Sequence, residues 1–366
     1  MTNERSDLLT ALPVRDNLRG KVPYGAPQID VPVALNTNEN THPVPADVQK
    51  AIADEVAHAA VGINRYPDRE FVQLREGFAE YLGHGLSADN VWAANGSNEI
   101  LQQLMQVFAG SGRTVLSFIP TYSMYPVLAN ATGSEFIAGQ RAEDFTLSPA
   151  LAAAQVEEHR PNLVILCSPN NPTGTALGPE VIDAVYQASA AFNAMVVVDE
   201  AYAEFSRDPA STALNLLADR PRLVVTRTMS KAFSLAGARI GYFAAAPEVT
   251  DAIRLVRLPY HLSAVSQATA LAALRNRASL LAGVEEIKKQ RDRIVDELRN
   301  MGLKPAVSDA NFVFFGGDFE APVMWQKLLD HGVLIRDVGV QGHLRVTAGT
   351  EQETTAFLRA MQACLA

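Results

Sequence analysis

Four short segments place polar side chains directly after a run of apolar residues, where a buried strand would end. The first is Asn-Gly-Ser-Asn-Glu at 95–99, which follows the apolar run 91–94. A Gly-Ser turn into a helix offers free backbone N–H groups and the positive end of the helix dipole, an arrangement that suits a phosphate. Ser and Asn are also ordinary helix N-caps, and taken alone this segment favours a cap.

The second and third segments add amide, carboxyl and phenol groups. Ser-Pro-Asn-Asn-Pro-Thr-Gly at 168–174 makes a turn whatever its function, but its adjacent Asn side chains could hydrogen-bond a ring hydroxyl or a carboxylate. Asp-Glu-Ala-Tyr at 199–202 follows the apolar run 195–198, so we expect a partly buried acid that needs a cationic partner. A helix-capping Asp is the alternative, but it does not account for Tyr202.

The fourth segment carries a lysine. Lys231 lies in the turn Thr-Met-Ser-Lys-Ala-Phe at 228–233, just past the apolar run 223–226. Most lysines are solvated surface charges. A lysine that is desolvated near other cations has a lowered pKa instead, and it acts as an amine nucleophile towards carbonyl groups. Ser230 beside it and Arg239 eight residues further on resemble an anion cradle.

These segments would meet at one edge of a sheet. From residue 90 onward, short apolar runs alternate with helical patterns, which predicts an α/β fold with a mostly parallel sheet covered by helices on both faces. Sites in such sheets form at the carboxyl ends of the strands. The predicted strands are Val91–Ala94, Thr114–Phe118, Leu163–Cys167, Met195–Val198, Leu223–Thr226 and Ile240–Ala245, and the predicted helices include Ile100–Phe108 and Pro179–Ala191.

Both ends of the chain differ from this centre. The Pro- and Gly-rich start predicts an extended arm, and the last third predicts a smaller α+β domain that opens on an amphipathic helix. We expect an arm at 1–45, a large α/β domain at 46–264 and a small domain at 265–366. The small domain's predicted elements are a helix over 284–298 that stops at Gly302, strands Phe312–Phe315, Val333–Arg336 and Leu344–Thr347, and a closing helix Glu351–Cys364.

Composition excludes several classes of protein. The chain has 366 residues, 48% of them apolar, and a net charge of −9, so we expect neither disorder nor general binding to nucleic acids or anionic membranes. Two cysteines, Cys167 and Cys364, are too few for a disulfide framework or a cysteine-based metal site, and we expect no metal. The absence of a signal-peptide pattern and of a membrane-length apolar run predicts a cytoplasmic protein.

Taken together, the four segments resemble the pyridoxal-phosphate-dependent aminotransferases of fold type I. Each motif alone is moderately specific, but all four occur in that family's order and spacing, and the resemblance extends over essentially the whole chain. Within the family the chain is most similar to the class II histidinol-phosphate aminotransferases, through Asn-Arg-Tyr-Pro-Asp at 64–68, Pro-Thr-Tyr at 120–122 and Leu-Arg-Val-Thr at 344–347. The resemblance implies a seven-stranded mixed sheet, pyridoxal 5'-phosphate as cofactor and a homodimer with composite sites.

The resemblance also implies roles for individual residues. Lys231 would bind the cofactor as a Schiff base and then move the α-proton, and Asp199 would keep the pyridine nitrogen protonated so that the ring becomes an electron sink. Asn171 and Tyr202 would complete the catalytic set by hydrogen-bonding the ring oxygen, and Tyr122 would stack on the ring. The cofactor phosphate would be held by Gly96, Ser97, Asn98, Thr228, Ser230 and Arg239, and by Tyr66 of the neighbouring subunit.

On the substrate side, Arg345 would bind the substrate α-carboxylate, because the planar guanidinium fork matches a carboxylate. Tyr24, Tyr260 and Arg336 resemble positions that contact a substrate phosphate, since two phenols and an arginine can bind a dianion. Asn171 would also border the substrate. The structural alternatives are a packed arm residue for Tyr24, a loop anchor for Tyr260 and a water-facing strand residue for Arg345. The substrates implied are histidinol phosphate with 2-oxoglutarate, or imidazole acetol phosphate with glutamate.

Other functions stay open at this point. The same fold could act on an aromatic amino acid such as phenylalanine, could decarboxylate a phosphorylated amino acid, or could be a non-catalytic binding or regulatory protein. The intact Lys231, Asp199, Asn171 and Arg345 speak against the last. One departure concerns Asn-Thr-His-Pro at 40–43, where the family usually has proline directly after the Asn, so the wall built by this stretch is expected to differ. His42 and His261 receive no role.

Overall fold

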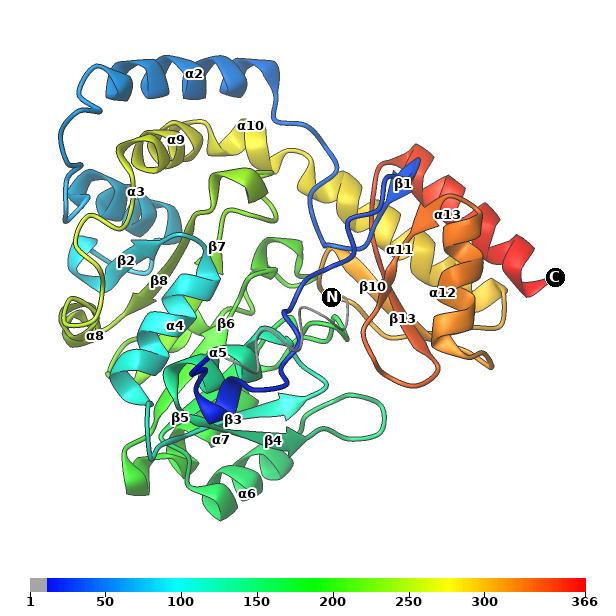
Figure 1. Cartoon of the computed structure of the whole chain (residues 1–366), viewed down its shortest axis with the longest axis horizontal. Coiled ribbons are helices and arrows are strands. Elements are labelled where there is room, and N and C mark those ends of the chain that lie inside the picture. The colour runs from blue at the N-terminus through cyan, green and yellow to red at the C-terminus, as the bar shows by residue number, and fades with distance from the viewer. Residues whose placement is uncertain (1–11) are drawn as a thin grey trace.

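A seven-stranded sheet forms the centre of the computed structural model, which describes residues 12–366 (Figure 1). The strand order is β2-β8-β7-β6-β5-β3-β4. Strand β8 runs antiparallel to both of its neighbours, and every other pair is parallel, which confirms the mostly parallel sheet. The strands are β2 (Val91–Ala94), β3 (Thr114–Ile119), β4 (Glu135–Gln140), β5 (Leu163–Cys167), β6 (Met195–Asp199), β7 (Leu223–Thr228) and β8 (Gly241–Ala245).

Central strands of this sheet are buried along their whole length, which is why their apolar runs are easy to recognise. The edge strand β4 is different: most of its residues are only half-buried or exposed, and it carries Glu and Gln at its ends. The individual strand predictions omitted it for this reason. It is the strand that completes the seven implied by the family resemblance.

Helices surround the sheet, with α4 crossing in front of it in Figure 1. The predicted helix 100–108 begins earlier, at Ser97, and the predicted helix 179–191 ends at Ala188, before the short 3-10 helix Ala190–Phe192. The helices of this part are α2 (Ala46–Ala60), α3 (Val72–Leu82), α4 (Ser97–Phe108), α5 (Met124–Thr132), α6 (Pro149–His159), α7 (Pro179–Ala188), α8 (Pro247–Ile253), α9 (Ala264–Arg275) and α10 (Arg277–Leu281).

The C-terminal part contains a second, four-stranded antiparallel sheet of order β12-β13-β10-β9, on the right in Figure 1. Its strands are β9 (Lys304–Pro305), β10 (Phe312–Gly316), β12 (Arg336–Asp337) and β13 (His343–Thr347), with helices α11 (Val284–Asn300), α12 (Ala321–Asp330) and α13 (Glu351–Leu365).

The prediction of one strand over Val333–Arg336 is wrong. The chain changes sheets at Ile335: β11 (Val333–Leu334) pairs in parallel with β1 (Val33–Ala34), whereas β12 pairs with β13. A continuous apolar run cannot reveal such a change, because each half is buried by a different partner.

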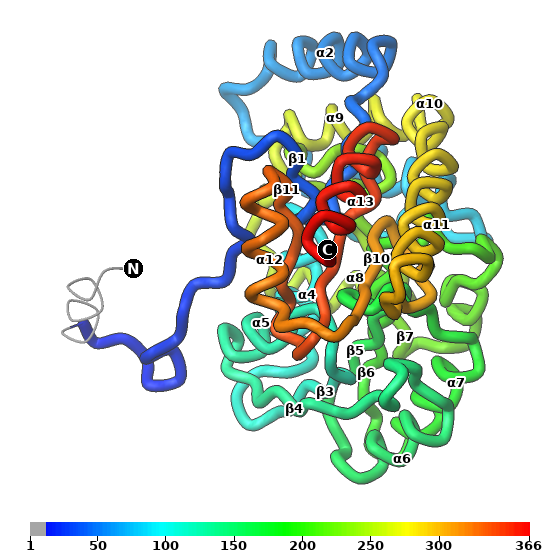
Figure 2. The backbone as a smooth tube through the Cα atoms, turned by 90° about the vertical axis from the view of Figure 1, so that its right-hand side faces the viewer, coloured from blue at the N-terminus to red at the C-terminus, as the bar shows by residue number. Residues whose placement is uncertain are grey.

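The N-terminal arm follows an extended course between two anchor points and leaves the body of the molecule in Figure 2. Near its start, beside the 3-10 helix Asp16–Leu18, the Arg15 guanidinium donates to the Ala131 carbonyl at the end of α5 (3.0 Å). Further along, β1 pairs with β11. The first eleven residues of the predicted arm lie outside the described residues.

The division of the chain at 45 and 264 stays a prediction. Helix α9 packs against α2 and α3, and this packing favours a second boundary after α9, later than the sequence indicated. The pairing of β1 with β11 joins the arm to the C-terminal part.

Candidate active site

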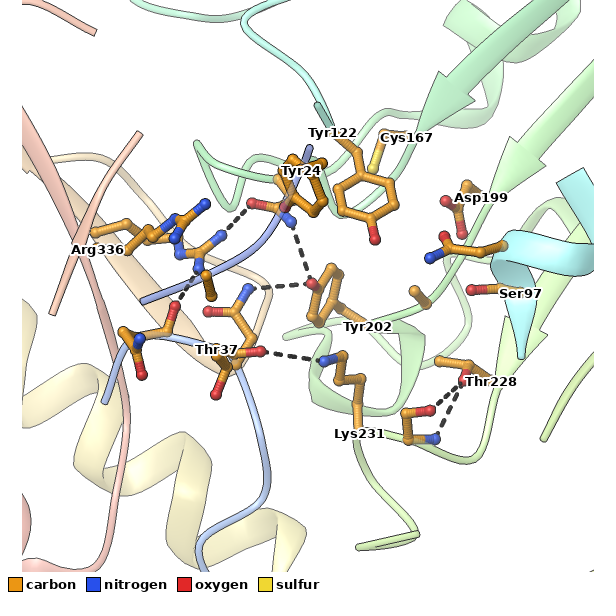
Figure 3. Close-up of a pocket in the computed structure, with 18 of the residues that line it drawn as sticks. Tyr24, Thr37, Ser97, Tyr122, Cys167, Asp199, Tyr202, Thr228, Lys231 and Arg336 are labelled. Carbon is orange, nitrogen blue, oxygen red and sulfur yellow. Dashed lines mark hydrogen bonds between the residues drawn. The ribbon is translucent and has the colours of Figure 1, made fainter. Parts of the chain in front are cut away.

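The polar segments meet around one cavity of about 250 Å³ at the carboxyl ends of β5, β6 and β7 (Figure 3). The arm and the second sheet close it from the other side. The predicted residues on its wall are Tyr24, Ser97, Asn98, Tyr122, Asn171, Asp199, Tyr202, Thr228, Ser230, Lys231, Arg239, Arg336 and Arg345. Residues without a predicted role also line it: Ala26, Asn36, Thr37, Asn38, Cys167 and Ala201.

Hydrogen-bond donors gather at the end of the cavity beside the start of α4. Gly96 precedes the helix with φ +88°, and a Cβ there would lie 2.6 Å from the Arg239 guanidinium. Gly241 at the start of β8 approaches the helix so closely that a Cβ would meet the Ser97 nitrogen at 2.2 Å. Both glycines therefore let backbone and guanidinium groups crowd around the first turn of α4, whose N–H groups have no partner within the helix.

Two hydroxyl groups join these donors from the end of β7. The Thr228 hydroxyl donates to Ser230 Oγ (3.0 Å), and Arg239 Nη1 donates to the same oxygen (3.3 Å). In the first turn of α4, Asn98 Oδ1 is buried and has no hydrogen-bond partner among the described residues. Helix terminus, hydroxyls and guanidinium together have the chemistry of a phosphate cradle.

Asp199 is the last residue of β6, and only 3% of it is exposed. Burial raises the pKa of its carboxyl group, while hydrogen bonds from Tyr125 and Thr226 oppose that rise. The Tyr125 hydroxyl donates to Oδ2 (2.8 Å), and the Thr226 hydroxyl donates to Oδ1 (3.1 Å). Sequence reasoning missed Tyr125, because only the fold brings α5 to the end of β6.

Lys231 follows β7 and turns its amine into the cavity (Figure 3). Its Nζ donates to the Thr37 carbonyl of the arm (3.3 Å). Burial, with the Arg345 and Arg239 guanidinium groups nearby, lowers the pKa of Lys231 to about 8. The pKa of this amine is therefore lower than that of a solvated surface lysine.

A chain of hydrogen bonds links Tyr202 to the substrate side. The Tyr202 hydroxyl accepts from Asn38 Nδ2 (3.1 Å) and from Asn171 Nδ2 (3.3 Å). Asn171 Oδ1 in turn accepts from Arg345 Nη1 (2.5 Å), and Arg345 Nη2 donates to the Asn36 carbonyl (2.8 Å). Asn38 has no predicted role, because it lies in a segment with no regular pattern, where its backbone adopts the left-handed region with φ 56°.

Arg345 and Arg336 are register partners on β13 and β12, and both line the cavity. Burial lowers the pKa of Arg345 to about 10, and its Nε has no hydrogen-bond partner among residues 12–366. Tyr24 reaches the same wall from the arm. An adjoining hollow of about 570 Å³ is bounded by five of the same side chains, Tyr24, Tyr122, Asn171, Arg336 and Arg345. This side of the cavity therefore offers two cations and a phenol to an anionic substrate.

Three predicted residues do not line the cavity: Gly96, which stands just before α4, and the tyrosines Tyr66 and Tyr260. Tyr66 is 81% exposed, and its ring stacks on that of Tyr260, with centroids 4.5 Å apart and planes at 15°. Neither ring lines the cavity of its own chain.

The unusual stretch at 40–43 also stays outside the cavity wall. Asn40 Nδ2 donates to the Ala232 carbonyl next to the catalytic lysine candidate (3.4 Å). The hydroxyl of Thr41 and Nε2 of His42 are buried without a partner in the part of the chain that the structure describes. His261 packs its ring on Trp92 and bonds the Ala93 carbonyl through Nε2 (2.9 Å), which is a structural role.

The cavity fits a pyridoxal phosphate. The Lys231 amine can bind the carbonyl of this cofactor, the Asp199 carboxylate can pair with its pyridine nitrogen, and the cradle at α4 can hold its phosphate. All three groups line the same cavity. No group of three His, Cys, Asp or Glu within residues 12–366 is placed to hold a metal ion. The described helices include none long and apolar enough to cross a membrane.

This fold and this set of groups define a pyridoxal-phosphate-dependent transferase. The chain belongs to the class I and II aminotransferase family, which it matches over residues 31–361.

Within that family, the chain is similar to proteins named as histidinol-phosphate aminotransferases. A histidinol-phosphate aminotransferase of Paenarthrobacter aurescens is 66% identical over 363 residues, covering 99% of this chain and 98% of the relative. One of Frankia casuarinae is 59% identical, with coverage of 96% and 89%. The crystal structure of the histidinol-phosphate aminotransferase from Sinorhizobium meliloti, in complex with pyridoxal-5'-phosphate, superposes with a TM-score of 0.83 at 27% identity, covering 92% of this chain and 91% of that one.

Proposed function

We propose that the chain transfers an amino group from L-histidinol phosphate to 2-oxoglutarate, reversibly, giving imidazole acetol phosphate and glutamate in two half-reactions. In each half-reaction, an amino group and a carbonyl oxygen change places, so no oxidant or reductant is needed. This is a step of histidine biosynthesis. The names of the close relatives support this choice of substrate.

The observation that carries the proposal is the pair Arg336 and Arg345. The two lie opposite each other on neighbouring strands and both reach the cavity, with Tyr24 beside them. A phosphate dianion and a dicarboxylate each need at least two cationic or hydrogen-bonding groups on the substrate side. A pocket for phenylalanine would replace one of these groups with an apolar side chain.

The residues of the cavity divide the work. Bound pyridoxal phosphate supplies a carbonyl that takes up the amino group and a ring that withdraws electrons. Lys231 Nζ binds the cofactor at that carbonyl, and as a free amine it carries the substrate α-proton. A lysine pKa near 8 suits this acid/base role. Asp199 provides the counter-charge to the ring nitrogen. Asn171 and Tyr202 donate to the ring oxygen, and Tyr122 covers a ring face.

The remaining predicted residues hold anions. The cradle of Gly96, Ser97, Asn98, Thr228, Ser230 and Arg239 binds the cofactor phosphate. Arg345 binds the carboxylate of glutamate, and Arg336 with Tyr24 binds the substrate phosphate.

We also propose a homodimer in which each chain completes its partner's site. Tyr66 and Tyr260 stack together away from their own cavity, so both rings are presented to the same place. The segments that carry them expose further apolar side chains, among them Val61, Leu255 and Leu258, and such patches are typical of subunit interfaces. In this arrangement Tyr66 reaches the cofactor phosphate and Tyr260 the substrate phosphate of the partner subunit.

A cytoplasmic location is part of the same proposal. Both cysteines are free and buried, which is compatible with a reducing compartment.

The test of the reaction is absorbance between about 300 and 500 nm on the purified holoenzyme, with one amino donor added at a time. We expect histidinol phosphate and glutamate each to convert the visible band of the lysine-bound cofactor to that of the amine form, with histidinol phosphate acting at lower concentration. A band that responds to phenylalanine and not to histidinol phosphate would favour an aromatic aminotransferase. Release of carbon dioxide without an oxo-acid would indicate a decarboxylase.

The test of the dimer mixes two inactive variants. Lys231→Ala removes the lysine from the site of the chain that carries it. Tyr66→Ala removes the ring that the chain contributes to the site of its partner subunit. After the two proteins are unfolded and refolded together, mixed dimers should regain one intact site each, with up to about a quarter of wild-type activity per subunit for random pairing. Mixtures that stay as inactive as the separate variants would contradict the shared site.

A further inference from the structure

One buried phenol touches the site only through other residues. Tyr125 is fully buried in the first turn of α5 and does not line the cavity. Its hydroxyl donates to Asp199, a contact that the proposed chemistry has not used.

We propose that Tyr125, together with Thr226, is a positioning residue that fixes the Asp199 carboxylate against the pyridine nitrogen and keeps it ionised there. The proposal rests on the proposed pairing of Asp199 with that nitrogen.

The two donors hold the carboxylate from the protein side. Tyr125 approaches Oδ2 from α5 at 2.8 Å, and Thr226 approaches Oδ1 from the neighbouring strand β7 at 3.1 Å. Asp199 itself lines the cavity, whereas neither donor does. With one fixed donor on each oxygen, the carboxylate cannot rotate freely, and its remaining acceptor capacity is directed at the cavity.

Tyr125 also contacts the ring predicted to cover the cofactor. The rings of Tyr122 and Tyr125 meet edge to face, with centroids 5.5 Å apart and planes at 88°. Tyr122 lies just before α5, which begins at Met124, and Tyr125 lies in the first turn of that helix. A single phenol therefore sets both the group at the nitrogen end of the cofactor and the group on its face.

The other charged and titratable groups around Asp199 do not provide this hold. Burial raises the pKa of the Cys167 thiol to about 12, so it is neutral, and Arg141 interacts with that thiol while its Nε donates to the Phe118 carbonyl. Glu200 is a further anion that disfavours ionisation of Asp199, but it is itself paired with Arg227. Burial also raises the pKa of Tyr125, so its hydroxyl stays a donor at every working pH.

The experiment compares five holoenzymes: wild type, Asp199→Ala, Tyr125→Phe, Thr226→Val and Tyr242→Phe. The last is the matched control, because Tyr242 is an equally buried phenol whose hydroxyl has no hydrogen-bond partner among residues 12–366. Each protein is loaded with pyridoxal phosphate labelled with ¹⁵N in the ring. The chemical shift of that nitrogen between pH 6 and 9 reports its protonation, and kcat and KM are measured beside it.

We expect a protonated nitrogen in the wild type and in Tyr242→Phe. In Tyr125→Phe the proton should be held about tenfold less tightly, and kcat should fall by about 10- to 100-fold, as for the loss of one hydrogen bond to a charged group. KM for glutamate should change little, because Arg345 is untouched. Thr226→Val should shift the nitrogen in the same direction, and it carries the test if Tyr125→Phe does not fold.

Three results would overturn the proposal in distinguishable ways. If Asp199→Ala loses the nitrogen proton while Tyr125→Phe and Thr226→Val keep it as in the wild type, Asp199 acts without this hold. If Asp199→Ala itself keeps the proton, the proposed pairing of Asp199 fails, and the role of Tyr125 fails with it. A fall in kcat with an unchanged nitrogen signal would indicate a merely structural effect and would also count against the proposal.

Discussion

The cofactor side and the substrate side of the cavity are built in different ways. On the cofactor side, Asp199, Thr228 and Lys231 stand at or just past the ends of neighbouring strands of one sheet, and their partners are buried groups of the same sheet and its helices. On the substrate side, Tyr24 comes from the arm and is 45% exposed, and Arg336 comes from a two-residue strand of another sheet.

The difference teaches which groups are fixed before any ligand binds. The strand ends are held by the ladder and by a close-packed core, so the charged groups there need little reorganisation. Tyr24 and Arg336 are less enclosed, because the arm is largely exposed around Tyr24 and the strand of Arg336 has only two residues, both half-buried. We therefore expect substitutions on the cofactor side to stop turnover in general, and substitutions on the substrate side to change which substrate is used.

The largest expected effect is that of Lys231→Ala. Without the amine there is no covalent attachment of the cofactor and no acid/base for the α-proton, so kcat should fall by at least about 10⁴-fold for every substrate. Turnover and the visible band of the purified protein measure both losses, with Lys50→Ala on the exposed face of α2 as the control. Normal turnover of Lys231→Ala would contradict the assignment of this cavity as the active site.

Arg345→Ala should have the next largest effect. It tests a residue of the substrate side that also contacts Asn171. Loss of a buried charge-assisted contact costs about 1.5–3 kcal/mol, so kcat/KM should fall by about 10- to 100-fold. Because Arg345 also holds Asn171, activity should fall for both substrates, and the fall should be larger for glutamate, because histidinol phosphate has no α-carboxylate. Arg336→Ala is the matched variant, and its loss should be larger for histidinol phosphate. If Arg345→Ala and Arg336→Ala lost activity in the same ratio for the two substrates, the two arginines would not have different roles.

A smaller effect is expected from pH on the capture of the cofactor. Protonated Lys231 cannot attack a carbonyl, and its pKa is about 8, so the reactive neutral fraction is about one-tenth at pH 7 and about nine-tenths at pH 9. The rate at which cofactor-free protein binds pyridoxal phosphate should therefore rise about ninefold over this interval, as followed by stopped-flow absorbance. A midpoint at pH 10 or above would show that the amine is not desolvated.

The smallest effect should be that of Tyr24→Phe on the substrate side. The substitution keeps the ring in the arm and removes one hydroxyl, which corresponds to about a five- to tenfold loss of kcat/KM for the phosphorylated substrate. The glutamate half-reaction of the same protein serves as the internal control and should be unchanged. A loss shared by both substrates would mean that Tyr24 supports the cavity rather than the phosphate.

Sequence reasoning was strongest where one local pattern decides the outcome. The buried strands β5 and β6 are built on short apolar runs that lead directly into polar residues, so both the strand and the polar group at its end could be predicted. The same local logic placed Lys231 after β7. It failed for β4, an edge strand whose half-exposed residues carry no such pattern.

Contacts between distant segments could not be predicted in this way. Tyr125 is one apolar residue of a short helix until the fold brings it to Asp199, and Asn38 is held by hydrogen bonds to Tyr202, Thr347 and Asn311. The split of 333–336 between two sheets is of the same kind, because the partner of β11 lies at the other end of the chain. The sequence records each residue's own preference, whereas these contacts join residues that lie between 74 and 309 positions apart in the chain.

The pairing of β1 with β11 has a consequence for how the protein is made. During synthesis, all seven strands of the large sheet and Lys231 have been translated once residue 245 is complete. The partner of β1 and the two substrate arginines follow only about ninety to a hundred residues later, at 333–345. The arm must therefore wait for its strand partner while the ribosome adds about 300 residues, and the cofactor side can fold before the substrate side has been synthesised.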